Sequence, residues 1–197
     1  MKRIARIAAV LALALPGLAL GATSTWQLDP AHTHAIFGVR HLVITTVKGE
    51  FGKTTGTLVL DEADVTKSKV EATIDVTTLN TREPKRDEHL RSPDFFDVAK
   101  HQTITFKSTK VEKAGEGKLR VTGDLTLRGV TKSVTLDVAG PTQEIKDPWG
   151  NVKRGVSATG KINRKDFGLN WSKAIEAGPV VGDEVTIEIE SELAKAK

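Results

Sequence analysis

The chain has 197 residues, no cysteine, and 29 Lys and Arg residues against 25 Asp and Glu residues. The absence of cysteine excludes disulfides and thiol chemistry. Residues 1–22 hold three of the basic residues and no acid, which leaves 26 basic residues against 25 acidic ones, a net charge of +1. Such a balance does not favour binding to nucleic acid or to a strongly anionic membrane.

The first residues have the pattern of a secretory signal peptide. Lys2, Arg3 and Arg6 form a basic start, an apolar stretch follows over 7–20, and small residues lie at its end. The apolar stretch is short for a bilayer span, which makes a retained anchor the weaker alternative. We therefore expect a cleaved signal peptide over 1–22, a single domain over 23–197, and a periplasmic or secreted mature protein.

About eight β-strands are predicted beyond this segment. Apolar and polar residues alternate most clearly over 69–77, where Val70, Ala72 and Ile74 share one face. Such alternation is typical of a strand with one buried and one solvated face. The predicted strands are 33–41, 51–60, 69–77, 101–111, 118–127, 131–139, 152–162 and 183–193.

Short turns are expected between most of these strands. The segment 26–30 is interpreted as a lead-in that ends in a turn. Leu42–Ile44 is expected to be a compact apolar turn that can plug an opening, with the next strand restarting after Gly49. Arg128–Val130 is predicted to be a tight hairpin connection, and Asp147–Asn151 has proline early and glycine late, as turns do.

Two longer insertions, 80–100 and 163–182, interrupt the strand pattern. In the first of them we expect one or two short helical turns. Ser92 is a candidate N-cap for such a turn, with Pro93 at the first helical position. The lysine-rich end over 194–197 is expected to be frayed.

Together these elements predict an all-β fold with short helical insertions. An antiparallel sheet of about eight strands with one apolar face removes its edges most simply by closing into a barrel. A barrel of this size can hold one small ligand. A two-sheet sandwich is the alternative, because strand patterning separates the two architectures poorly.

Few residues point to catalysis or metal binding. No phosphate-binding loop or serine-hydrolase motif is present. His32 and His34 lie two apart on a strand, and a metal site there would need a third ligand such as His89 or a carboxylate. Asp87 and His89 can act as acid and base. The alternatives are hydrogen bonds at a turn for the histidines and an ion-paired loop for the charged cluster, so we assign no catalytic residue, metal or cofactor.

The distribution of aromatic residues favours an apolar cavity. Aromatic side chains on irregular segments beside a barrel can line or cover such a cavity, and ordinary core filling is the alternative. They are Phe37 and Phe51 beside the first turn, Phe95 and Phe96 in the first insertion, and Phe167 and Trp171 in the second. Small inward-facing residues, which would leave room inside, are Ala35, Ala72, Gly123, Ala158 and Gly160.

Short motifs spread over nearly the whole of 23–197 carry a family resemblance. They are Leu28-Asp29-Pro30-x-His32, Phe37-x-Val39-Arg40-His41-Leu42, Val47-x-Gly49-x-Phe51-Gly52, Asn80-Thr81, Arg86-Asp87-x-His89-Leu90-Arg91-Ser92-x-Asp94-Phe95-Phe96-Asp97, Phe106-x-Ser108, Thr122-Gly123-Asp124-Leu125-Thr126-Leu127-Arg128-Gly129-Val130-Thr131 and Arg164-x-Asp166-Phe167-Gly168. In these motifs the chain resembles the YceI-like family of exported lipid- or polyisoprenoid-binding proteins. Ser133 departs from the family, which often has proline there.

The resemblance implies a lipocalin-like antiparallel barrel with an elongated apolar tunnel and no established enzymatic activity. Its implied partners are an isoprenoid quinone or another long-chain amphiphile, often a second copy in a homodimer, and at most transiently a membrane. We expect the tail of the ligand in the tunnel and its polar head near the mouth, beside Arg40, Arg82, Asp87 and His89.

The residues expected to bind the ligand are Phe37, Val39, Arg40, His41, Phe51, Ile74, Val76, Arg82, Asp87, His89, Phe95, Phe96, Ile104, Phe106, Leu125, Leu136, Phe167 and Trp171. One alternative function is an enzyme acting on a lipid or small exported substrate, with Asp87 and His89 as acid and base. The other is an unliganded structural or stress-related barrel.

Overall fold

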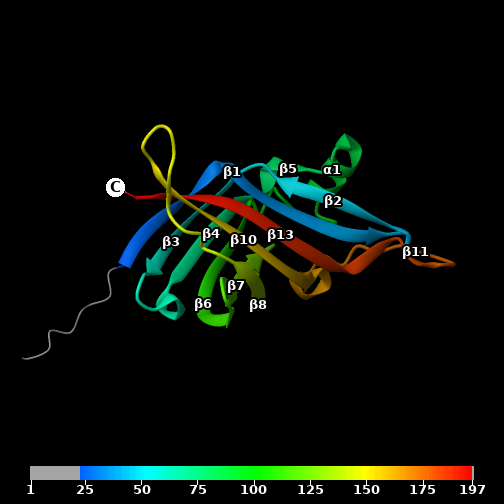
Figure 1. The fold of residues 1–197 in the computed structure, drawn as a ribbon. Coiled ribbons are helices and arrows are strands. Elements are labelled where there is room, and N and C mark those ends of the chain that lie inside the picture. The colour runs from blue at the N-terminus through cyan, green and yellow to red at the C-terminus, as the bar shows by residue number, and fades with distance from the viewer. Residues whose placement is uncertain (1–22, 197) are drawn as a thin grey trace, which may run out of the picture.

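Eight antiparallel strands close into a barrel, as predicted (Figure 1). The computed structural model describes residues 23–196, so the predicted signal peptide lies outside the described residues. The barrel strands, in spatial order, are β1 (Thr23–His41), β3 (Thr54–Asp61), β4 (Lys69–Asp75), β6 (Thr103–Gly115), β7 (Lys118–Leu127), β8 (Val130–Ala139), β10 (Val152–Asn163) and β13 (Val181–Lys195), and β13 pairs with β1 to close the circle.

Period-two alternation explains the best-predicted part of the barrel. In β7 the side chains of Val121, Leu125 and Leu127 are buried, while Arg120 and Asp124 on the other face are exposed. A two-residue turn, Arg128-Gly129, joins β7 to β8, and both of its residues have positive φ (50° and 75°). This is the type I′ geometry that suits the twist of a hairpin, so the predicted tight connection is confirmed.

β1 is the long strand on which the barrel closes. Its middle pairs with β13, where Ala35 lies opposite Ile189 and Phe37 opposite Ile187. On its other edge, residues 23–27 pair with β3, and residues 35–41 pair with β2 (Thr45–Phe51). The second half of β1 therefore pairs with β2 in place of β3, and these two strands extend with the start of β13 beyond the other barrel strands (Figure 1).

Both ends of the described chain are more ordered than predicted. The expected lead-in over 26–30 is part of β1, because Trp26 pairs with Lys195 and the register shifts only after Leu28. The expected fraying over 194–197 is wrong for the described residues, since the backbone N–H of Ala196 donates to Thr25 O at 2.8 Å. Long-range pairing between the two ends satisfies backbone groups that local patterning cannot assign.

The first hairpin also differs from the prediction. Leu42–Ile44 forms an exposed turn at the far end of β1 and β2 rather than a plug. β2 runs continuously from Thr45 through Gly49, and the predicted strand 51–60 is divided, since Phe51 ends β2 and β3 begins at Thr54. The aromatic ring of Phe37 packs against Gly49, whose missing side chain makes this contact possible.

The first insertion contains the single α-helix of the described residues, α1 (Pro84–Arg91). Glu83 is its N-cap and Pro84 occupies its first turn. The prediction that Ser92 begins a helix is wrong, because Ser92 is the C-cap of α1 and donates its backbone N–H to His89 O. The short strand β5 (Leu79–Asn80) precedes the helix and pairs with β2.

The second insertion begins with a 3₁₀ turn, η3 (Arg164–Phe167), and continues into a small hairpin of β11 (Ala174–Ile175) and β12 (Gly178–Pro179). The other minor elements are η1 (Val65–Lys67), η2 (Val76–Thr78) and β9 (Ile145–Lys146), which pairs with β10. None of the helices within residues 23–196 has the length and apolar character needed to cross a membrane.

Two buried clusters lie toward opposite ends of the barrel. The larger one packs under α1 and η3 and includes Phe51, Phe95 and Phe167. The smaller one surrounds the fully buried Trp26 with Leu60 and Leu193.

Candidate functional site: an apolar cavity in the barrel

The barrel interior holds a cavity of about 440 Å³. All eight barrel strands contribute inward-facing residues to its wall, and α1 and the two insertions contribute side chains at one end, called the α1 end below. The volume lies in the range usual for sites that hold small organic ligands. The wall is almost wholly aliphatic and aromatic, so the cavity suits a hydrocarbon chain better than a polar molecule.

Small residues contribute to the cavity in two different ways. Ala35, Ala72 and Ala158 line it, as expected. Gly123 instead accepts the ring of Phe106, because a Cβ at position 123 would lie 2.4 Å from Phe106 Cζ. The space at Gly160 is likewise taken by Leu136, so these two glycines accept neighbouring side chains and do not leave room for a ligand.

Most of the residues expected to bind a ligand do line the cavity. They are Phe37, Val39, Arg40, His41, Phe51, Ile74, His89, Phe95, Phe96, Ile104, Phe106, Leu125, Leu136 and Trp171.

Four of the expected residues lie outside the cavity wall. Val76 and Phe167 are each 1% exposed and belong to the packed cluster beneath the insertions. Arg82 is exposed and has a positive φ of 64°, in the loop before α1. Asp87 is buried and accepts hydrogen bonds from the backbone N–H (2.8 Å) and the hydroxyl of Thr81. Asp87 therefore fixes the start of the helical insertion.

Other cavity residues are absent from the expected set although they lie an even number of positions from expected residues on the same strands. Examples are Leu119 and Val121 on β7 and Val134 on β8. The signal that finds them is the period-two pattern itself, which applies to whole strands and not only to their aromatic residues.

An aromatic cluster lies at the α1 end of the cavity. The His89 ring meets the rings of Phe95 and Trp171 edge-on, with centroid separations of 5.0 and 5.2 Å. His89 Nε2 lies 2.9 Å from a carboxylate oxygen of Asp94. The cluster gives this end of the cavity a polar edge on an apolar wall.

The predicted acid–base pair of Asp87 and His89 is not formed. The carboxylate of Asp87 is bound to Thr81, whereas the imidazole of His89 is paired with Asp94. Residues two apart on a helix point in different directions, which explains the separation.

Arg164 holds the second insertion against the cavity. Its side chain is almost fully buried and donates hydrogen bonds to the carbonyl oxygens of Leu169, Trp171 and Gly182, with a further ion pair to Asp183 at 3.1 Å. Trp171 is thereby fixed in the cavity wall.

Thr54 is the polar exception on the inner face of β3. It is 2% exposed, it lies among the cavity-lining residues, and its hydroxyl has no hydrogen-bond partner in the described part of the chain. A buried unpaired hydroxyl costs free energy relative to a paired one.

Comparison with known proteins decides the family. The YceI-like domain model matches residues 26–193, which include all of the barrel strands except the first three residues of β1 and the last two of β13.

The chain belongs to the YceI-like family.

Two relatives show how far the similarity extends. A UPF0312 protein of Vibrio parahaemolyticus is 37% identical over 191 residues, covering 95% of this chain and 94% of that protein. The crystal structure of a Campylobacter jejuni YCEI protein is 33% identical, with a TM-score of 0.68, and the match covers 80% of this chain and 90% of that one. This YceI-like protein therefore shares both sequence and fold with proteins of similar length.

A third comparison extends to a more distant solved structure. A polyisoprenoid binding domain from Saccharophagus degradans has a TM-score of 0.63 at 16% identity, covering 87% of this chain and 98% of that domain. At that identity the likeness concerns the fold.

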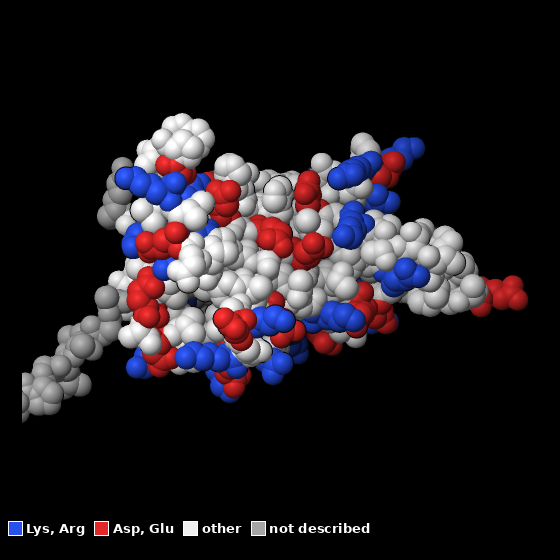
Figure 2. Space-filling view, viewed as in Figure 1, with Lys and Arg blue, Asp and Glu red and all other residues white. Residues whose placement is uncertain are grey.

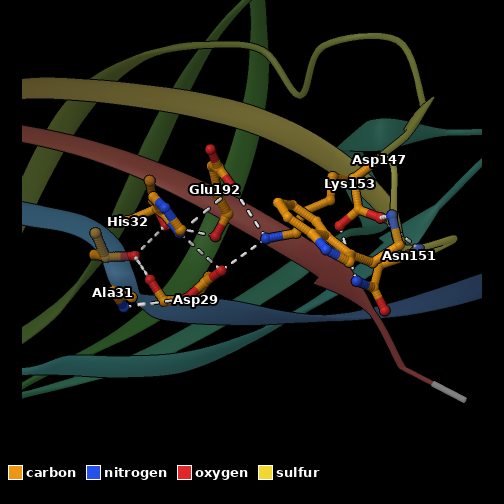
Figure 3. Close-up of polar contacts among 10 residues, drawn as sticks. Asp29, Ala31, His32, Asp147, Asn151, Lys153 and Glu192 are labelled. Carbon is orange, nitrogen blue, oxygen red and sulfur yellow. Dashed lines mark hydrogen bonds and ion pairs between the residues drawn. The ribbon is translucent and has the colours of Figure 1, made fainter.

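The YceI-like barrel carries one further polar cluster, at the end opposite α1 (Figure 3). Lys153 Nζ lies 2.7 Å from Asp29 and 3.0 Å from Glu192, and His32 Nδ1 lies 3.1 Å from Asp29. The Lys153 ammonium lowers the pKa of Asp29 to about 2, with a further contribution from the hydrogen bond to His32. The carboxylates of Asp29 and Glu192 meet the imidazole of His32 here, as a metal site would require. The Lys153 ammonium already supplies a positive charge to both carboxylates.

The histidines weighed as metal ligands are not gathered at one site. His32 belongs to this cluster, whereas His89 belongs to the aromatic cluster at the α1 end. The expectation of no metal remains a prediction.

Proposed function

We propose that this protein is a carrier that holds the hydrocarbon tail of an isoprenoid-type amphiphile in its barrel. The observation that carries the proposal is the cavity of about 440 Å³ with an almost wholly apolar wall. The polyisoprenoid binding domain of the same fold supports the choice of ligand class, and an isoprenoid quinone is the member of that class that we favour.

Burial of the tail supplies the affinity. Each methylene group moved from water to an apolar wall contributes about 0.8 kcal/mol, so one five-carbon isoprene unit contributes roughly 4 kcal/mol before the loss of chain entropy. All eight strands of one barrel contribute to the cavity wall, so a single chain offers an apolar surface to the tail.

The polar head of the ligand belongs at the α1 end. Arg40, His41 and His89 line the cavity there and carry the donors that a carbonyl, hydroxyl or phosphate group requires. The expected signal peptide supports a periplasmic location, where such a carrier would move a ligand that is insoluble in water.

The test is mass spectrometry of an organic-solvent extract of the protein purified from its native compartment without detergent. We expect a stoichiometric isoprenoid lipid in the wild type and its loss in Phe106→Asp, because a charge on the cavity wall opposes burial of the tail. Thr105→Asp is the matched control, since Thr105 is the exposed neighbour on the same strand. A cooperatively folded Phe106→Asp protein that retains the lipid, or a wild type that is reproducibly empty, contradicts the proposal.

A further inference from the structure

Two hairpins lie side by side at the end of the molecule where β11 is labelled (Figure 1). One is the β1–β2 turn and the other is the β11–β12 hairpin. The backbone N–H of Leu42 donates to Val180 O at 2.9 Å, and Val43 packs against the backbone at Gly178. We call Leu42, Val43, Ile44 and Ile175 the apolar tip.

The apolar tip presents large hydrophobic side chains to solvent. Ile44 is 78% exposed, Val43 is 49% exposed and Ile175 is 46% exposed. Figure 2 shows mostly uncharged surface over this end of the molecule, with blue atoms within it and red atoms at its extremity. A grouping of exposed aliphatic residues, unlike a single one, marks a surface that contacts another apolar phase.

The backbone conformation of the β1–β2 turn is unfavourable for the apolar residues that form it. Leu42 and Val43 both have positive φ, at 51° and 65°, and the N–H of Ile44 closes the turn on His41 O. Such a type I′ turn favours Asn-Gly, and a β-branched residue with positive φ is strained. The β7–β8 turn of the same protein has glycine at its second position. The first turn thus carries apolar side chains in spite of both strain and exposure, a combination that points to function.

The tip adjoins the cavity. Arg40 and His41 immediately precede the turn, Val180 and Val181 follow β12, and all four line the cavity. The guanidinium of Arg40 also donates to Val43 O at 2.7 Å, which joins the turn to the cavity wall.

We propose that the apolar tip inserts into the interface of an anionic phospholipid bilayer and places the cavity where an amphiphile can pass between membrane and barrel. This inference rests on the proposed carrier function. Basic residues next to the tip favour an anionic surface: Arg40 and Lys173 stand against the single acid Glu176 over 40–47 and 172–180, while Lys48 farther along β2 is paired with Glu188 at 3.6 Å. Insertion is driven by the aliphatic side chains, because the charge of the whole domain is near neutral.

The experiment compares wild type with Leu42→Asn/Val43→Gly in sedimentation with vesicles of phosphatidylcholine, with and without phosphatidylglycerol. We expect the variant to unfold at a higher temperature, since Asn-Gly relieves the strained turn, and to lose at least about tenfold in vesicle partitioning. Ile145→Ser is the matched control: Ile145 is 63% exposed on the β9–β10 hairpin at the opposite end, and its loss should leave partitioning unchanged.

Two further readouts separate this inference from the carrier function. Geranylgeraniol added from ethanol should bind wild type and the turn variant equally, whereas its transfer from vesicles should be slower for the variant. If wild type does not bind geranylgeraniol but still partitions to vesicles, the carrier function fails alone. If the variant partitions to vesicles as well as wild type does, the proposed insertion of the apolar tip is wrong. The proposal is also wrong if wild type does not bind vesicles but forms a dimer that depends on the tip in sedimentation velocity, because the tip would then contact a second copy.

Discussion

The Thr54 hydroxyl and the Thr33 hydroxyl are both buried, but their surroundings differ. Thr33 Oγ1 pairs with Asp29 O and Ser191 Oγ at 2.7 Å each, whereas Thr54 Oγ1 has no partner within residues 23–196. Valine has the same shape as threonine without the hydroxyl, so the two positions form an internal comparison of a paired and an unpaired polar group.

We predict that Thr54→Val leaves the free energy of unfolding unchanged or raises it by about 1 kcal/mol, and that Thr33→Val lowers it by about 1–2 kcal/mol. The reason is that the first variant removes an unsatisfied group and the second removes satisfied hydrogen bonds. Urea unfolding of the ligand-free protein measures both values. A destabilised Thr54→Val protein would show that its hydroxyl is satisfied in solution.

The Asp29–Lys153 pair predicts how stability depends on pH. The folded-state pKa of Asp29, about 2, lies below its ordinary value of 3.8. Its contribution is therefore fully present above about pH 4 and is lost as the pH falls toward 2. We expect at most about 2 kcal/mol, reduced by solvent screening because 22% of the Asp29 side chain is exposed.

The measurement is the difference in unfolding free energy between wild type and Asp29→Asn across this pH range. The difference should be largest near neutral pH and should shrink on acidification. Asp147→Asn, at an exposed turn nearby, is the comparison for a carboxyl whose pKa is lowered chiefly by a hydrogen bond from Asn151 and not by contact with a lysine. A difference between wild type and Asp29→Asn that does not change with pH would contradict the assignment.

At the level of elements, the sequence predicts which residues face inward wherever the alternation of apolar and polar residues within one strand is enough to assign them. The inward residues of β7 and β8 follow from alternation, and so do most cavity residues. The start of β1 could not be predicted this way, because Pro30 and a shift of register interrupt the pattern and the pairing partner lies at the other end of the chain. The helical turn expected over 80–100 is present as α1, but its start was misassigned because Pro84 and Pro93 are equally good first-turn residues and Glu83 is an uncommon N-cap.

The 163–182 insertion depends on one side chain. We predict that Arg164→Met lowers the free energy of unfolding by about 3–5 kcal/mol, because several buried carbonyl oxygens and Asp183 lose their donor. Hydrogen exchange should increase first over 169–182, and Trp171 fluorescence should change with it. Lys165→Met removes only the exposed partner of Asp183 and should cost less than about 1 kcal/mol.

At the level of the whole molecule, the sequence predicts a barrel, and the family resemblance predicts the kind of ligand. The position of the charged residues of 80–94 relative to the cavity could not be predicted. Nothing in the sequence separates the four residues that were expected to contact a head group. In the structure Arg40 and His89 line the cavity, whereas Arg82 and Asp87 do not. Side-chain direction on a short helix depends on packing against the barrel, which no local pattern encodes.

Closure of the barrel between its first and last strands has a consequence for folding. The second edge of β1 finds its partner only when residues 181–195 have been made, so a chain without them exposes the unpaired edges of β1 and β10. Pairings of such large sequence separation form slowly, because a loop of nearly the full chain must close first. We therefore expect the barrel to close only after its last strand is complete, although local hairpins such as β6–β7–β8 do not depend on that strand.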